Sequence, residues 1–170
     1  MAVRPIVTWG HPVLHSPAES VSEIDGKLVD LVRDMIDTMY AAPGIGLAAP
    51  QIGVPLRVVV VDLSVGERAG ELIQLVNPVI LDRSGDQRHD EGCLSIPGFE
   101  GAPPRPASVT VKGLDLSGNE RALTGTGLLA RAFCHEVDHL DGLLFVDRLS
   151  PLKRDLMRRR LRRHFRSAQR

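Results

Sequence analysis

The pentapeptide at residues 135–139, His-Glu-Val-Asp-His, constrains the fold of this chain more than any other feature of its sequence. Residues four apart on an α-helix lie on the same face, one turn apart. A helix here therefore brings the imidazoles of His135 and His139 together, with the Glu136 carboxylate beside them. Apolar residues precede the motif, and Gly142 follows it as a helix stop. The sequence thus predicts a helix that carries metal-hydrolase geometry on one face.

The position of a third metal ligand decides between this interpretation and two histidines that merely pack against a core or lie on a solvated face. A catalytic zinc-type site usually takes three protein ligands and leaves one position for water. Phe145 stands where an HExxHxxGxxH pattern would have its third histidine, no glutamate follows Glu136, and the one later histidine, His164, lies in a run of arginines. The third ligand is therefore predicted to lie upstream.

Two cysteines are available as that ligand. Cys134 leaves a helix about 100° around from His135, so it is predicted to be a small buried residue that does not share a metal with the histidines. Cys93 is the better ligand, because Gly92 gives the backbone before it freedom to turn. A thiolate ligand requires a reducing compartment, since a disulfide between Cys93 and Cys134 would destroy the site.

Three motifs together make the chain resemble a bacterial peptide deformylase. They are GIGLAAPQ at residues 44–51, EGCLS at residues 91–95 and HEVDH at residues 135–139, and the similarity runs from the N-terminal segment to about Lys153. The resemblance implies hydrolysis of the N-formyl group on the initiator methionine of a nascent polypeptide, with release of formate. It also implies an α+β fold, in which small antiparallel and mixed sheets surround a central helix that carries the histidines.

The resemblance assigns the catalytic groups residue by residue. Cys93, His135 and His139 would bind a divalent metal, and Glu136, which cannot easily be a fourth ligand, would exchange protons with water and with the leaving amine. The side-chain amide of Gln51 and the backbone N–H of Leu94 would stabilise the oxyanion. Family members commonly use Fe²⁺, although a thiolate with two imidazoles also accepts Zn²⁺, Co²⁺ or Ni²⁺.

The same resemblance implies a substrate-binding set. Gly44 and Gly46 would let an extended peptide approach and pair with the edge of the sheet as an added strand. The residues expected to shape or border the pocket for the methionine side chain are Ile45, Glu91, Leu128 and Ala132. On periodicity alone, Leu128 and Ala132 are simply core residues of the helix.

The sequence departs from the family pattern at two positions. Cys134 stands where many family members have glutamine immediately before the first metal histidine, which changes a neighbour of the site and leaves its ligands intact. Pro103 stands where a valine often precedes the proline and arginine. The local shape of that loop, and the substrate side-chain preference, are therefore expected to differ.

Apolar periodicity and turn residues place the other elements. A helix is predicted at residues 27–41, capped by Asp25, and strands at residues 57–61, 72–76, 79–81 and 108–112, with a strand end and turn at residues 114–119. Thr124 or Thr126 could cap the metal-binding helix. Residues 64–70 read as a flexible loop and residues 101–106 as an irregular connection, neither with evident chemistry.

The last part of the chain is predicted to be a basic helix that starts at Ser150 and Pro151. One apolar stripe is expected from Leu152, Leu156, Met157, Leu161 and Phe165. A formal net charge of zero hides the basic residues of this segment, which are Lys153, Arg154, Arg158, Arg159, Arg160, Arg162, Arg163, Arg166 and Arg170. They suggest an electrostatic contact with ribosomal RNA, the alternative being a solvated amphipathic helix packed on the body.

Length and hydropathy predict one compact domain, with the catalytic part at residues 1–150 and the basic helix and tail at residues 151–170. No apolar run approaches the ~20 residues that cross a bilayer, so a cytoplasmic location is expected. Two other functions remain open: a metallopeptidase, which would cut unformylated peptides internally, and a non-catalytic module that binds metal or the ribosome. The intact set of Gln51, Cys93, His135, Glu136 and His139 argues against such a module.

Overall fold

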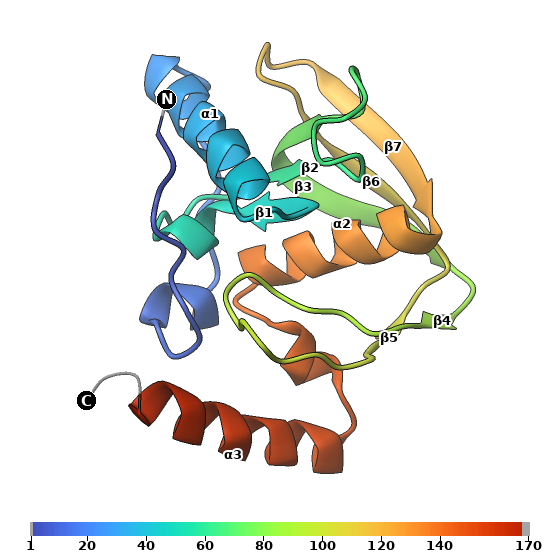
Figure 1. Cartoon of the computed structure of the whole chain (residues 1–170). Coiled ribbons are helices and arrows are strands. Elements are labelled where there is room, and N and C mark those ends of the chain that lie inside the picture. Colours follow the sequence, from blue (N-terminus) through green and yellow to red (C-terminus); the bar gives the residue numbers. More distant parts are fainter. Residues whose placement is uncertain (1, 168–170) are drawn as a thin grey trace.

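The computed structural model of the chain describes residues 2–167 (Figure 1). Its central element is a five-stranded sheet in the order β1-β2-β3-β6-β7, with every strand pair antiparallel. The strands are β1 (Gly46–Ala48), β2 (Val58–Val61), β3 (Ile73–Ser84), β6 (Ser108–Leu114) and β7 (Glu120–Thr126). The α+β class is confirmed. The expected mixed sheet is not found among the described residues, where both sheets are antiparallel and the one parallel contact is an isolated bridge between Glu19 and Leu56.

Strand β2 separates two cores, because its four valines are all buried and alternate between the faces of the sheet. Val58 and Val60 pack with helix α1 (Gly26–Ala41), whereas Val59 and Val61 pack with helix α2 (Gly127–Leu140). The predicted first helix is confirmed, and so is its cap: the Asp25 carboxylate accepts a hydrogen bond from the Leu28 N–H at 2.9 Å.

Strand β3 corrects the prediction of two separate strands at residues 72–76 and 79–81. One strand runs through both, with register shifts between Val76 and Val79 and between Ile80 and Asp82. Asn77 adopts a positive φ of 51° at the first shift, and its side chain bonds both the N–H and the C=O of Val21. The bulge accommodates Pro78, which cannot donate a ladder hydrogen bond.

Helix α2 follows β7 without a loop and lies under the sheet (Figure 1). Thr126 occupies the N-cap position but makes no capping hydrogen bond through its side chain, while the Thr124 hydroxyl bonds Thr110. The helix ends at Leu140, and Gly142 follows with a φ of +77°, as the predicted stop requires. A Cβ there would lie 2.8 Å from the backbone of Ser16.

Helix α3 (Pro151–Ser167) lies at the opposite end of the molecule from α1 (Figure 1). Its start at Pro151 is confirmed, but the single apolar stripe is wrong. Met157 and Leu161 are buried against the short helix η3 (Phe145–Arg148) and its neighbours, whereas Leu152 and Leu156 are 71% and 50% exposed. Arg170 lies outside the described residues.

A second, two-stranded sheet pairs β4 (Gln87–Arg88) with β5 (Pro104–Arg105) on the other side of α2. Between these strands the chain runs past α2 as a long loop, residues 89–103, which contains the EGCLS motif. Short 3-10 helices complete the fold at Pro12–His15 and Ala49–Ile52. None of the helices described within residues 2–167 is both long and apolar enough to span a membrane.

Candidate metal centre

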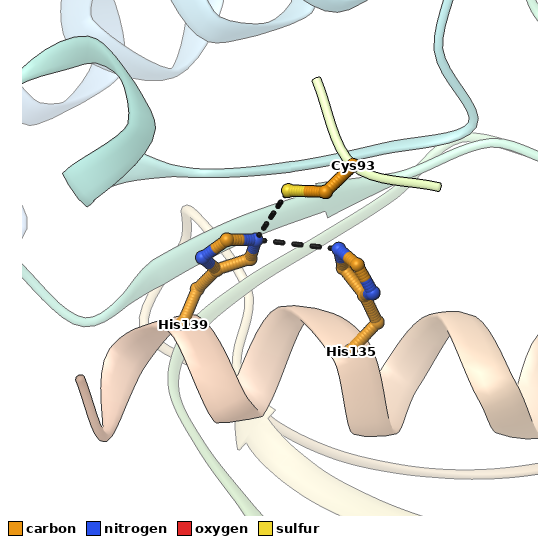
Figure 2. Close-up of side chains that lie close together, drawn as sticks. All are labelled: Cys93, His135 and His139. Carbon is orange, nitrogen blue, oxygen red and sulfur yellow. Dashed lines mark hydrogen bonds between the residues drawn. The ribbon is translucent and has the colours of Figure 1, made fainter. Parts of the chain in front are cut away.

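Helix α2 and the loop between β4 and β5 bring Cys93, His135 and His139 together (Figure 2). The His139 Nε2 atom lies 3.3 Å from the Cys93 sulfur and 3.3 Å from the His135 Nε2, and all three ligand atoms lie within 4.8 Å of one another. Tetrahedral bonds of ~2.0–2.3 Å to one ion hold their ligand atoms roughly 3.3–3.6 Å apart. The spacing and the donor set therefore fit a divalent metal ion. Residues 2–167 contain no second group of this kind.

The electrostatics of the two histidines differ. Burial lowers the pKa of His139, and the positive charges of His135 and Arg105 lower it further, which favours the neutral imidazole that binds metals. Burial also opposes protonation of His135, but its interactions with the Cys93 sulfur and the Glu91 carboxylate outweigh burial and raise its pKa. The potential at His135 therefore favours positive charge, as a cation-binding site requires.

Glu136 is buried beside this cluster, with 4% of its surface exposed. Its Oε2 atom has no hydrogen-bond partner among the described residues, and its Oε1 atom faces Gly46 on β1, where a Cβ would lie only 2.5 Å away. Burial raises the pKa of Glu136 to about 7. The carboxyl can therefore take up and release a proton near neutral pH.

Gln51 is fixed in one orientation by its neighbours. Its Oε1 accepts a hydrogen bond from the Ala48 N–H at 2.9 Å, so its Nε2 is the end that faces Ser95 Oγ at 3.2 Å and the Cys93 sulfur at 3.7 Å. The motif at residues 44–51 thus delivers an amide donor to the Cys93 side of the cluster. Ser95, which the sequence interpretation did not single out, is fully buried and helps to hold it.

Glu91 is held on both sides. Its carboxylate accepts bonds from Arg105 Nε and Nη2 at 2.8 and 3.0 Å, and its Oε1 lies 3.0 Å from Nδ1 of the ligand-cluster residue His135. Burial opposes ionisation, but the bonds from His135 and Arg105 outweigh it and lower the pKa of Glu91. Glu91 is therefore a charged partner that orients His135.

Arg105 is a residue that the sequence interpretation missed. The connection at residues 101–106 had no evident chemistry, yet Arg105 lies in it, 5% exposed, and bonds both Glu91 and Asp138. No periodic pattern marks a buried arginine of this kind. One argument from the sequence could have found it. A buried carboxylate such as Glu91 needs a cation beside it to stay ionised, and a nearby arginine can supply that charge.

A cleft of about 640 Å³ opens beside the cluster. The residues expected at the substrate site all line it: Gly44, Ile45, Gly46, Gln51, Glu91, Leu94, Leu128 and Ala132. Leu128 is 43% exposed, so it is a cleft residue and not the core residue that periodicity alone indicates. The sheet order ends at β1, which leaves the outer edge of that strand without a strand partner among the described residues.

Known proteins similar to this chain belong to one family. The family model described as polypeptide deformylase matches residues 3–155. The chain belongs to the peptide deformylase family. Among the relatives of this family member, the peptide deformylase of Thermodesulfovibrio yellowstonii is 51% identical over 162 residues, which cover 95% of this chain and 98% of the relative.

Solved structures of the family have the same fold. The peptide deformylase of Legionella pneumophila matches with a TM-score of 0.90 at 46% identity and covers 99% of both chains. That of Thermus thermophilus matches with a TM-score of 0.88 at 41% identity, covering 98% of this chain and 99% of the other. The activity is that of the family: metal-dependent removal of the N-formyl group from nascent polypeptides.

Proposed function

We propose that Cys93, His135 and His139 hold the catalytic metal, with Fe²⁺ as the native ion and Ni²⁺, Co²⁺ or Zn²⁺ as substitutes. The observation that carries this assignment is the convergence of the three ligand atoms: His139 Nε2 lies 3.3 Å from each of the other two, and all three lie within 4.8 Å of one another. Iron follows from the family resemblance, because the donor set accepts all four ions. A divalent ion held there would act as a Lewis acid on the formyl carbonyl and would lower the pKa of its bound water toward ~7.

Glu136 is the proton carrier in this proposal. Glu136 lines the cleft and its buried Oε2 has no hydrogen-bond partner among the described residues. A pKa of about 7 suits both uptake of a proton from water and its delivery to the leaving amine. Water would lose a proton to Glu136 as its oxygen bonds to the formyl carbon, and Glu136 would return that proton to the amine nitrogen as the carbon–nitrogen bond breaks. Glu136 is therefore proposed as general base and general acid in turn.

Gln51 and Leu94 are proposed to stabilise the oxyanion. The Gln51 Nε2 donor already faces the Cys93 side of the cleft, because its Oε1 is bonded to Ala48. Leu94 follows Cys93 directly and lines the cleft, which supports its backbone N–H as the second donor. Removal of one such donor commonly costs ~3–4 kcal/mol of transition-state stabilisation.

The substrate is proposed to bind in an extended form along the free edge of β1. Gly44 and Gly46 line the cleft beside that edge, and the methionine side chain would enter between Ile45 and the α2 residues Leu128 and Ala132. Glu91 borders this space, with its charge neutralised by Arg105. An apolar side chain is favoured there because the wall is largely aliphatic.

A metal analysis tests the ligand assignment. Cys93→Ser should abolish tight binding of one metal equivalent, whereas Cys134→Ser should keep it. Both residues are free cysteines, but only Cys93 belongs to the ligand cluster. Equal metal content in the two variants would contradict the proposal.

The protein is further proposed to work in the cytoplasm and to contact ribosomal RNA through α3. Arg159, Arg162 and Arg166 are exposed on this helix, which supports a phosphate-binding surface; the alternative is a solvated helix with no partner. Ribosome binding should weaken with salt, and the salt slope should fall by about one for each arginine replaced by glutamine. Binding that does not depend on salt, or no binding by the full chain, would refute the contact.

A further inference from the structure

Five side chains form a continuous chain of polar contacts from the start of the C-terminal region to the metal centre. They run, in order, through Arg148, Asp138, Arg105, Glu91 and His135. At the outer end, Arg148 of η3 donates from Nη2 to Asp138 Oδ1 at 2.8 Å and from Nε to Asp138 Oδ2 at 3.3 Å. Arg148 thus makes a bidentate contact with one carboxylate on α2.

The same Asp138 carboxylate also determines how Arg105 is placed. Arg105 Nη1 donates to Asp138 Oδ2 at 2.7 Å, while its Nε and Nη2 donate to the two oxygens of Glu91. The guanidinium is planar, so fixing one edge on Asp138 directs the other edge at Glu91. Glu91 Oε1 then meets His135 Nδ1, which sets the plane of the ring whose Nε2 faces Cys93 and His139.

Charge balance gives Arg148 a part in this arrangement. The side chains of Asp138 and Glu91 are each 8% exposed, and the buried guanidinium of Arg105 contacts both. Glu91 has a further partner in His135, whereas Asp138 needs a second cation of its own if Arg105 is to keep two donors on Glu91. Arg148 supplies it from the surface, with 45% of its side chain exposed.

We propose that Arg148 is a positioning residue for the metal centre, acting on His135 through Asp138, Arg105 and Glu91. This inference rests on the proposed ligand set of Cys93, His135 and His139. Arg148 touches neither that set nor the cleft. Its loss lets Arg105 turn toward Asp138, weakens the two-point contact with Glu91 and frees the His135 ring.

The test uses the full chain loaded with Co²⁺, whose visible absorption reports ligand geometry and whose release to a chelator reports metal retention. Arg148→Met removes the donors and keeps a flexible apolar stem. Arg158→Met is the matched control, because Arg158 is 39% exposed and bonds Asp147 of the same η3 segment at 2.6 Å without touching the chain of contacts. Both variants remove one half-exposed arginine that is paired with an aspartate.

Arg148→Met should shift the cobalt absorption and release the metal about tenfold faster, the lower end of what loss of an outer partner costs. Arg148→Lys should fall between this variant and the wild type, because it keeps the charge but cannot span both oxygens. Arg158→Met should match the wild type in spectrum and release. If Arg148→Met is insoluble, Arg148→Gln takes its place, and its cobalt spectrum and release rate are compared with those of Arg158→Met.

Two results would overturn the inference, and they differ from one another. A spectrum and release rate of Arg148→Met equal to those of Arg158→Met would refute the role of Arg148 and leave the metal centre standing. A wild-type cobalt complex without a thiolate-to-cobalt band would refute the proposed ligand set, and the role of Arg148 would fall with it.

Discussion

At the residue scale, the proposed chemistry depends on how one buried carboxyl is placed. Glu136→Gln keeps the size of the side chain but cannot carry a proton between water and the amine. We expect kcat to fall by ~10²–10⁴-fold while one metal equivalent stays bound, as judged by formate release and metal analysis of the same sample. Full activity in this variant would show that another group moves the proton.

A substitution at Gly46 tests the placement of the Glu136 carboxyl while leaving Glu136 itself unchanged. A Cβ at Gly46 would lie 2.5 Å from Glu136 Oε1 and 3.0 Å from its Cδ, so Gly46→Ala must displace the carboxyl. We expect a loss of about 10²-fold in kcat, the size of effect that a shift of ~1 Å can cause, with metal content unchanged. Gly26→Ala is the control, because nothing lies within 4 Å of a Cβ there; equal kcat in the two variants would contradict this packing.

At the element scale, a single contact ties helix α1 to the loop that follows β2. The Tyr40 hydroxyl donates to Asp62 Oδ2 at 2.6 Å, and Asp62 also accepts bonds from Ser64 and from the Gly66 N–H. Burial and the Asp62 carboxylate raise the pKa of Tyr40 to about 12. The loop at residues 64–70, predicted from sequence to be flexible, is thus anchored at its start.

This contact predicts the response to alkaline pH. Because the folded-state pKa of Tyr40 lies above 10, its ordinary value, the neutral phenol favours the folded state. That stabilisation is complete below pH 10 and is lost as the pH rises through about 12. Tyr40 is the only tyrosine, so the tyrosinate absorbance should give one transition near 12, moving toward 10 in Asp62→Asn. A wild-type tyrosinate transition at pH 10, with the fold intact by circular dichroism, would contradict the hydrogen bond between Tyr40 and Asp62.

The sequence predicts a helix or strand when the residues that determine it lie within the element itself. It does not predict features that depend on contacts with residues far away in the sequence. Helix α1 carries its cap and apolar repeat within its own residues, and Gly142 marks the end of α2. Strand β7 escaped prediction because Leu123 is the one large apolar residue among its seven. The sequence around Asn77 did not show that β3 continues through it. The bulge at Asn77 is stabilised by hydrogen bonds to Val21, a residue far away in the sequence.

The residues of the candidate site also fall into two groups, those that the sequence identifies and those that only the structure reveals. The motifs contain the three proposed ligand residues, Glu136 and Gln51, which the spacing of HExxH and the family resemblance single out. Arg105 belongs to a family pattern that was interpreted only as loop shape, and Arg148 lies outside the three motifs. The contacts of both arginines with buried carboxylates become visible only in the structure. The exposure of Leu152 was likewise unpredictable, since it depends on which face of α3 meets η3.

At the scale of the whole molecule, the sheet, α2 and the loop between β4 and β5 form one scaffold around the cleft. One face of β2 packs on α2, which carries the proposed histidine ligands, and the Arg148 contacts join that helix to the C-terminal region. We propose that this scaffold hydrolyses formyl-methionyl peptides with a metal held by Cys93, His135 and His139.

Formate release from a short formyl-methionyl peptide tests that claim most directly. The protein would be purified without oxygen, because a ferrous site beside a thiolate is open to oxidation, and loaded separately with iron, nickel and zinc. We predict formate and free amine in equal amounts, no internal peptide cleavage, loss of activity on chelation and recovery when metal is restored. No formate from folded protein with metal confirmed at the site, or internal cleavage of an unformylated peptide, would contradict the claim.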